Sequence, residues 1–201
     1  MDLFASDPTV NLLPCDGIAN YHGPVLSPEQ ADRYQQILFD TIQWKNDETV
    51  IFGRHIVTAR KVAWYGDSEY LYAYSGTTKQ AMVWTPELRE LKSLVERLSK
   101  ATFNSCLLNL YHHGDEGMGW HSDDEKSLVQ NAAIASLSLG AERKFCFKHK
   151  QTQDKASVIL ENGSLLVMKG TTQSHWLHSL PKSKKILQPR INLTFRTIAC
   201  E

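Results

Sequence analysis

The second half of the chain is a series of short apolar segments separated by turns, and this pattern constrains the fold more than any other feature. The segments have the length and the β-branched or aromatic content that are typical of strands. They cover residues 103–111, 132–139, 144–148, 157–160, 164–168, 174–178 and 191–198. Many short strands in succession favour a sandwich or a double-sheet jelly roll.

Two helices are expected before these strands. Ser27 has the pattern of an N-cap, because Pro28 follows it and Gln30 can complete a capping box. Apolar residues at 31, 34, 37, 38 and 42 mark one face of the helix that follows. A second helix should start at Thr85 and carry an apolar stripe over residues 88–98. Both helices should pack on a sheet, whereas residues 1–26 should be irregular or form a short strand.

The length of 201 residues is that of one domain. We expect residues 1–100 to form an N-terminal extension, the helices and an aromatic-rich segment, and residues 101–201 to form the catalytic jelly-roll core. The predicted fold class is therefore α+β, mainly β, with the N-terminal helices supporting the sheets.

The composition sets limits on partners and compartment. Lys+Arg and Asp+Glu are both 22, so a nucleic-acid partner would have to be bound by local basic clusters. The four cysteines show no paired spacing, and we see neither a signal peptide nor a membrane-spanning apolar stretch. We expect a soluble, intracellular monomer with free thiols, in the cytoplasm, or in the nucleus if the source is eukaryotic.

One short motif suggests a metal site. His121 and Asp123 are two residues apart, so in an extended segment their side chains point to the same side. A histidine from a distant strand would complete a facial triad of two imidazoles and one carboxylate. This ligand set leaves coordination positions open and suits non-haem Fe(II) that activates O2.

A second motif suggests an anion clamp. In the segment 190–196, Ile191, Leu193 and Phe195 alternate with polar residues, as expected for a half-buried strand. The polar side would align two guanidiniums, an amide and a hydroxyl, which belong to Arg190, Asn192, Thr194 and Arg196. Arginine binds carboxylates through two parallel hydrogen bonds. A dicarboxylate clamp beside a metal triad suggests Fe(II) with 2-oxoglutarate as co-substrate.

These motifs resemble the AlkB family of Fe(II)/2-oxoglutarate dioxygenases, in particular its DNA repair members. The resemblance extends from about residue 50 to the C-terminus and includes Asn109-Leu110-Tyr111, Gly163-Ser164-Leu165-Leu166 and His178-Ser179-Leu180-Pro181. It implies a double-stranded β-helix and oxidative removal of N-methyl groups from DNA bases such as 1-methyladenine and 3-methylcytosine. The implied partner is single- or double-stranded DNA with alkylated bases, and RNA is a further candidate.

The resemblance also implies roles for single residues. Asn109, Tyr111, Asn192 and Thr194 would hold 2-oxoglutarate, with Arg190 on its distal carboxylate and Arg196 nearer the carboxylate that chelates iron. The third metal ligand could be His175 or His178 by spacing alone, and the resemblance favours His178. Asp124 and Glu125 could accept a hydrogen bond from the exocyclic amino group of the base. The remaining histidines in this half, His112, His113 and His149, are expected in solvent or near phosphates.

The aromatic-rich segment between the helices resembles the nucleotide-recognition lid of the family's duplex-DNA repair enzymes. There the position of Phe52 fills the gap left by a flipped base, and the positions of Tyr72 and Tyr74 line the base pocket. From the residues alone, these rings could equally be the core of a hairpin. Together with the neighbouring Gly53 and with Arg54 and Arg60, which could hold phosphates, they make up the predicted DNA-binding lid.

Three other functions are compatible with parts of this pattern. A related dioxygenase could act on RNA, protein or a small metabolite, but it would not need Phe52 flanked by arginines. A zinc hydrolase could use the same ligand set, but it would not need a pair of clamp arginines. A non-catalytic DNA-binding protein would release neither succinate nor formaldehyde.

Overall fold

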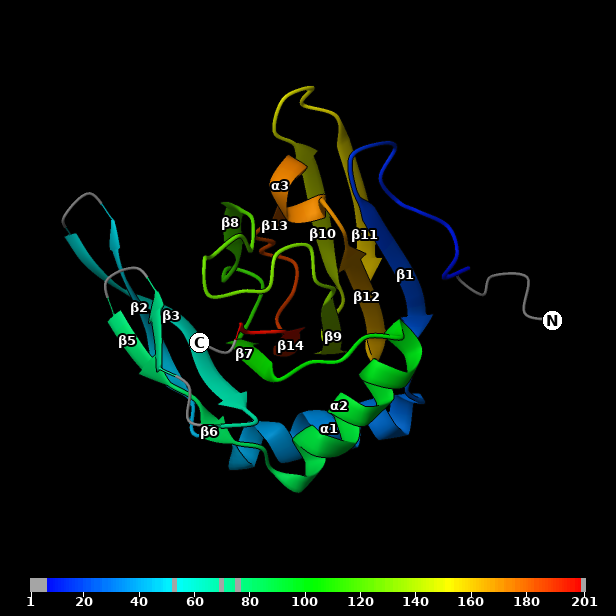
Figure 1. The fold of residues 1–201 in the computed structure, drawn as a ribbon. Coiled ribbons are helices and arrows are strands. Elements are labelled where there is room, and N and C mark those ends of the chain that lie inside the picture. Colours follow the sequence, from blue (N-terminus) through cyan, green and yellow to red (C-terminus); the bar gives the residue numbers. More distant parts are fainter. Residues whose placement is uncertain (1–6, 52–53, 69–70, 75–76, 200–201) are drawn as a thin grey trace.

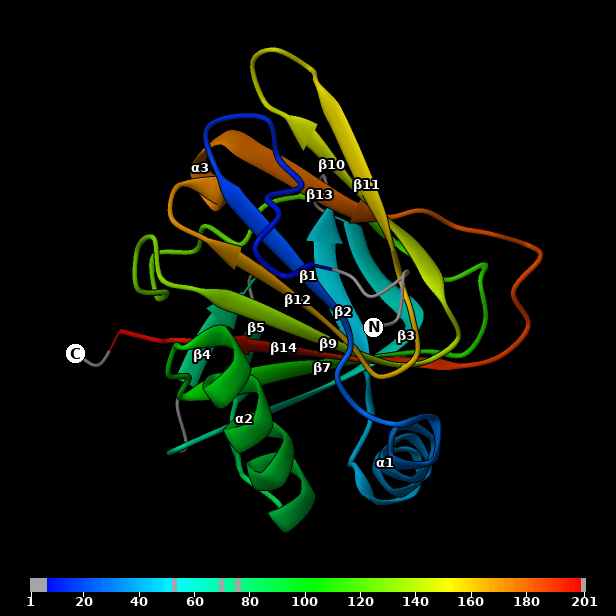
Figure 2. The same cartoon turned by 90° about the vertical axis from the view of Figure 1, so that its right-hand side faces the viewer.

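The structure is a computed structural model that describes residues 7–51, 54–68, 71–74 and 77–199. Two facing sheets enclose the site, and Figures 1 and 2 show them with the helices outside. The helices are α1 Pro28–Thr41, α2 Pro86–Ser99 and α3 Thr172–His175. The strands of the first hundred residues are β1 Ile18–Pro24, β2 Lys45–Ile51, β3 Arg54–Gly66, β4 Leu71–Tyr74, β5 Thr77–Gln80 and β6 Met82–Val83. The remaining strands are β7 Ser105–Tyr111, β8 Met118–His121, β9 Ile134–Gly140, β10 Arg143–His149, β11 Lys155–Leu160, β12 Ser164–Lys169, β13 Trp176–Leu180 and β14 Arg190–Arg196.

The strand order is that of the expected jelly roll. The major sheet has the order β1-β12-β9-β14-β7-β3-β2, with β6 pairing in parallel with β3. The minor sheet has the order β11-β10-β13-β8, and β4 and β5 form a separate hairpin. Strands that are far apart in sequence are neighbours in both sheets, as in a double-stranded β-helix. The predicted fold class is confirmed.

The outer face of the major sheet is covered by α1 and α2 (Figure 2). Leu38 of α1 and Leu88 of α2 belong to one buried cluster with Leu137 and Leu193 of the central strands. A second buried cluster lies between the sheets and includes Phe147, Leu166 and Trp176. Because side chains alternate along a strand, β14 and its neighbours bury apolar residues under the helices and present their other residues to the space between the sheets.

The helix starts follow the sequence prediction. Ser27 forms the capping box, since its hydroxyl accepts from the Gln30 amide N–H (3.3 Å) and its own N–H donates to the Gln30 side chain (3.0 Å). Thr85 caps α2 in the same position by accepting from the Leu88 N–H. The segment before α1 includes β1, which pairs antiparallel with β12. Of the two alternatives expected for residues 1–26, this part is thus a strand.

One predicted strand is wrong over part of its length. Residues 174–178 were expected to be extended, but the chain forms α3 up to His175, and β13 begins at Trp176. Tertiary contacts with the distant N-terminal segment hold this turn: the Thr172 hydroxyl accepts the Ile18 backbone N–H (2.9 Å), and the Trp176 indole N–H donates to the Cys15 carbonyl (3.0 Å). Both contacts lie at the link between β12 in one sheet and β13 in the other.

None of the helices in the described part of the chain combines the length and the apolar composition that crossing a bilayer requires.

The packing predicts which leucines matter for stability. Leu137 is completely buried between the major sheet and the helices, whereas Leu187 is 76% exposed. Leu137→Ala should lower the free energy of unfolding by about 2–5 kcal/mol, because it removes buried methyl groups and leaves a cavity. The control Leu187→Ala should change it by less than about 0.5 kcal/mol. Urea unfolding followed by circular dichroism measures both, and equal effects would contradict the assigned core.

Candidate metal and co-substrate site

Three side chains from two strands and a loop meet between the sheets. His121 is the last residue of β8, and His178 of β13 is its direct cross-strand partner. Asp123 follows two residues later, in the loop after β8. One ligand atom from each of the three residues lies within 4.8 Å of the others. The imidazole centroids are 4.2 Å apart, so the histidines can bind one ion together.

The surroundings leave both imidazoles ready to bind a metal. Nδ1 of His121 lies 2.8 Å from the Gly119 carbonyl, which can only accept, so Nδ1 carries the proton and Nε2 is free as a ligand. His178 is buried, and the Phe145 ring stacks on it at 5.4 Å. Burial lowers the pKa of His178 to about 3, despite the opposing charge of Asp123. The ring is therefore neutral at physiological pH, as a metal ligand must be.

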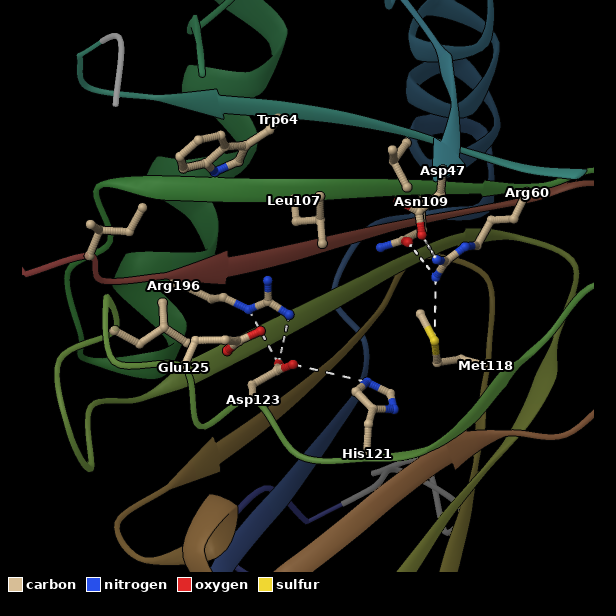
Figure 3. Close-up of a pocket in the computed structure, with 13 residues that line it drawn as sticks. Asp47, Arg60, Trp64, Leu107, Asn109, Met118, His121, Asp123, Glu125 and Arg196 are labelled. Atoms are coloured by element: carbon tan, nitrogen blue, oxygen red, sulfur yellow. Dashed lines mark hydrogen bonds and ion pairs between the residues drawn. The ribbon is translucent and has the colours of Figure 1, made fainter. Parts of the chain in front are cut away.

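Asp123 is held in its charged form. Burial works to raise the pKa of this carboxyl, but the net pKa lies below its ordinary value, and the charge of Arg196 is the largest of the opposing effects. The Arg196 guanidinium donates to Oδ2 from Nε (3.2 Å) and from a terminal nitrogen (2.8 Å). Oδ1 faces His121 (Figure 3). Two imidazoles and one carboxylate, with no further ligand from the described residues in the group, fit Fe(II) by donor type and open coordination.

The structure distinguishes between the two candidates for the third metal ligand, His175 and His178. His175 ends α3 and stacks on His149 at 6.1 Å, so it is outside the group that contains His178. His149, expected near solvent, is instead buried, because the turn after β10 folds around its ring. Its Nδ1 accepts the backbone N–H of Thr152 (3.0 Å), which leaves the proton on Nε2. Nε2 faces Cys15 and Asp16, and a protonated nitrogen is no ligand, so we assign no metal to this second cluster.

The predicted clamp lies at one end of the cavity beside the metal ligands. Arg190 is 2% exposed and donates to the Ser138 hydroxyl (3.0 Å) and the Asn192 carbonyl oxygen (2.7 Å). Its guanidinium lies over the Tyr111 ring, and burial lowers its pKa to about 10. Its Nε is buried without a hydrogen-bond partner among the described residues. A buried cation with only neutral partners and a spare donor fits the carboxylate of a bound ligand.

The other predicted co-substrate residues line the same cavity. In the sheet register, Asn109 and Tyr111 of β7 are directly opposite Asn192 and Arg190 of β14. The Asn192 amide donates to the Thr194 hydroxyl (2.9 Å) and so continues the polar row along β14. The cavity extends from Arg190 to His121, Asp123, His178 and Arg196. It thus joins the clamp to the metal ligands, as 2-oxoglutarate bound to both would require.

A second cavity opens on the other side of the metal ligands, and Figure 3 shows its lining. Its apolar walls are formed by Val62, Trp64, Leu107, Leu128 and Ile198. Besides Asp123 and Arg196, its charged groups are Arg60, paired with Asp47, and Glu125. Oε2 of Glu125 is buried without a hydrogen-bond partner among the residues described. The cavity therefore offers apolar walls and a carboxylate oxygen without a hydrogen-bond partner among the described residues, next to the metal group.

The structure brings together only part of the predicted substrate site. Arg60 is buried in the wall of the second cavity, where it donates to Asn109 (3.0 Å) as well as to Asp47. Asp124 is exposed and lies 3.6 Å from the Lys150 ammonium. Phe52 and Gly53 lie outside the described residues. Arg54 is in β3, and Tyr72 and Tyr74 are in β4, but their side chains are not among those described. The DNA-binding role of all these residues stays a prediction.

Three further residues have contacts at the site that were not predicted. Asp47 of β2 pairs with Arg60, and Gln173 of α3 accepts a hydrogen bond from the Asp123 backbone. Lys150 contacts the metal loop through Ser122. Each is a common surface residue type in a segment without a motif, so the sequence contained no signal for it.

Fold and site together define an oxygenase of the jelly-roll class with a facial metal triad. Residues 17–196 match the model of the 2OG-Fe(II) oxygenase superfamily. The chain is 42% identical over 156 residues to the human DNA oxidative demethylase ALKBH2, which covers 74% of this chain and 60% of the relative. It is 37% identical over 179 residues to the human alpha-ketoglutarate-dependent dioxygenase alkB homolog 3, covering 85% and 62%.

The chain belongs to the AlkB family within this superfamily. It spans about 60% of the length of the human demethylase that it matches. The solved structure of OsALKBH1 superimposes with a TM-score of 0.57 at 18% identity, covering 85% of this chain and 90% of the other, and supports the fold. The family implies Fe(II), 2-oxoglutarate and O2, the cofactors expected from the sequence.

The buried His178 predicts a pH-dependent stability of the metal-free protein. Its folded pKa of about 3 lies below the ordinary value of 6.5, so the unfolded state binds an extra proton between these values. The stabilisation is complete above pH 6.5 and is lost as the pH falls toward 3. Wild type should lose about 1 kcal/mol per pH unit more than His178→Gln between pH 6 and 4.5. Urea unfolding measures this, with His175→Gln as the control that keeps the wild-type slope.

Proposed function

We propose that this protein repairs DNA by oxidative removal of alkyl groups from base nitrogens, with 1-methyladenine and 3-methylcytosine as the substrate type. One observation carries the proposal: His121 and Asp123 line both cavities, and His178 lines the first cavity beside them. One cavity ends at the buried Arg190, and the other has apolar walls and the unpartnered oxygen of Glu125. The relatives named above, DNA oxidative demethylase ALKBH2 and alkB homolog 3, support the same activity.

The residues of the first cavity bind and orient the co-substrate. His121, Asp123 and His178 would hold Fe(II), and Arg190 would pair with the distal carboxylate of 2-oxoglutarate. Asn109, Tyr111, Asn192 and Thr194 complete the polar wall, and Arg196 keeps Asp123 charged and oriented. When bound, Fe(II) supplies the O2 activation that converts 2-oxoglutarate to succinate and CO2 and hydroxylates the N-methyl carbon, after which the hydroxymethyl group leaves as formaldehyde.

The second cavity suits a methylated base. Adenine methylated at N1 and cytosine methylated at N3 are cationic near neutral pH and carry an exocyclic amino group. The Glu125 carboxylate oxygen can accept a hydrogen bond from that group and offset the positive charge. Trp64 and Leu107 contribute apolar surface against which a planar base can pack. A neutral undamaged base gains less from the carboxylate and so binds less well.

We further propose that the base reaches this cavity by flipping out of the duplex. A methylated base pairs poorly, so its extrusion costs less than that of a normal base. Phe52, Gly53 and Arg54 would fill the gap and hold the backbone, with Tyr72 and Tyr74 at the base. The expected intracellular location, the monomeric state, the activity on RNA and the action of residues 1–201 as one domain are proposals of the same kind.

The activity can be tested directly. Anaerobic protein with Fe(II) and 2-oxoglutarate is mixed with oligonucleotides containing 1-methyladenine or 3-methylcytosine, and O2 is then added. Mass spectrometry should detect the unmethylated base, with equal amounts of succinate and formaldehyde. Single-stranded DNA, duplex DNA and RNA are compared in parallel. Turnover of 2-oxoglutarate without loss of the methyl group from any oligonucleotide would refute the proposed substrate class and favour a protein or small-molecule oxygenase.

Arg190 should control co-substrate affinity. Arg190→Met removes the charge-assisted hydrogen bonds to the distal carboxylate, each worth about 1.5–3 kcal/mol. The KM for 2-oxoglutarate should rise roughly tenfold to a hundredfold, with a smaller change in the KM for the oligonucleotide. Arg33→Met, an exposed position on α1, serves as the control. An unchanged KM in Arg190→Met would contradict the clamp.

A further inference from the structure

The loop that carries Asp123 is attached to α3, which lies in the link between β12 of the major sheet and β13 of the minor sheet. The backbone N–H of Asp123 donates to the side-chain oxygen of Gln173 at 2.9 Å. The Gln173 side-chain nitrogen in turn lies 3.5 Å from the sulfur of Met168, a buried residue between the sheets. Gln173 thus holds the main chain of the carboxylate ligand against a fixed part of the core.

Lys150 makes a second attachment at the same place. Its ammonium donates to the Gln173 backbone carbonyl (2.8 Å) and to the Ser122 hydroxyl (3.1 Å). The Asp124 carboxylate lies 3.6 Å away. The ammonium therefore links α3 to the residues on either side of Asp123. These contacts occupy its donors, although Lys150 lies close in sequence to Lys144 and Lys148, and such a cluster of lysines could otherwise contact phosphate.

The carboxylate of Asp123 is held from the opposite side. Arg196 of the major sheet binds Oδ2. If Arg196 were the only contact, the carboxylate could rotate about Oδ2. The hydrogen bond from the Asp123 backbone N–H to Gln173 restricts this rotation and so fixes the direction of Oδ1. The later part of the loop is tied to the major sheet as well, because the Val129 N–H donates to the Thr197 carbonyl (2.9 Å).

We propose that Gln173 and Lys150 form a clip that positions Asp123 for metal binding and, through the same loop, places Glu125 at the base cavity. Both are positioning residues, because they act through Asp123 and its neighbours and do not touch the ion or the base. The inference rests on the proposed metal site, and it goes beyond the ligands themselves by assigning their support to α3 and the turn after β10.

Mn(II) binding to the 201-residue protein in the absence of O2 tests the clip without turnover. Electron paramagnetic resonance measures free Mn(II), and circular dichroism checks the fold of each variant. Gln173→Met removes the acceptor at nearly constant size and should weaken Mn(II) binding roughly tenfold, the lower end of the range for outer-shell partners of metal ligands. Gln173→Glu keeps an acceptor for the Asp123 backbone N–H, so it should restore most of the affinity.

Lys150→Met should also weaken Mn(II) binding, with Lys155→Met, an exposed lysine of β11, as the matched control that changes nothing. Because both residues serve one clip, the double variant Gln173→Met/Lys150→Met should bind Mn(II) more tightly than the product of the two single effects predicts. Wild-type Mn(II) affinity in folded Gln173→Met, or equal loss in Gln173→Met and Gln173→Glu, would overturn the clip.

The outcome is independent of the proposed substrate. If Lys150→Met weakens oligonucleotide binding and leaves Mn(II) affinity unchanged, Lys150 is a phosphate contact and the clip is wrong. If the wild type binds Mn(II) and 2-oxoglutarate but demethylates no oligonucleotide, the proposed function fails and the clip stands on the Mn(II) data. If the wild type binds no Mn(II), the metal site and the clip both fail.

Discussion

The alternation of side chains along β14 is the constraint on which the rest of the site depends. Ile191, Leu193 and Phe195 are completely buried in the cluster under α1 and α2. Since successive side chains on a strand point to opposite faces, this burial forces Arg190 and Arg196 into the space between the sheets. The hydrophobic packing of the outer face therefore fixes the direction of the polar row, and a shift of one residue in register would place the guanidiniums under the helices.

The two arginines at the ends of this row have different tasks because their partners differ. Arg196 meets a carboxylate, Asp123, and joins the major sheet to the metal loop. Arg190 meets the neutral groups of Ser138 and Asn192, and its Nε has no partner among the described residues. A buried charge of this kind is costly unless an anion binds it. A carboxylate of a bound dicarboxylate would therefore stabilise the buried charge of Arg190 at this end of the cavity.

The metal ligands come from elements of different rigidity. His121 and His178 are cross-strand partners, so the hydrogen bonds of the minor sheet set their separation. Asp123 lies on a loop and needs separate supports, which Arg196 provides from β14 and Gln173 provides from α3, in the link between the two sheets. The same loop leads to Glu125 in the second cavity. A support that fixes the carboxylate ligand therefore also affects the group proposed to distinguish a methylated base from a normal one.

Local patterns in the sequence determined much of this arrangement. The short apolar segments predicted the jelly roll, the capping residues predicted both helix starts, and the spacing of His121 and Asp123 predicted that they face one way. The alternation along β14 predicted that its polar side chains all point to the same face of the sheet. These features follow from backbone geometry over a few residues, so they can be read without knowing what lies nearby.

Only the tertiary structure decided what these groups meet. It brought His178 next to His121 and placed His175 on α3, because the turn at Thr172 is held by the distant N-terminal segment. It buried Arg60 against Asp47 and connected Gln173 to the backbone of Asp123. These contacts join residues far apart in the chain, and their residue types carry no local pattern. The order of strands in the two sheets sets such distances, and no short stretch of sequence contains that order.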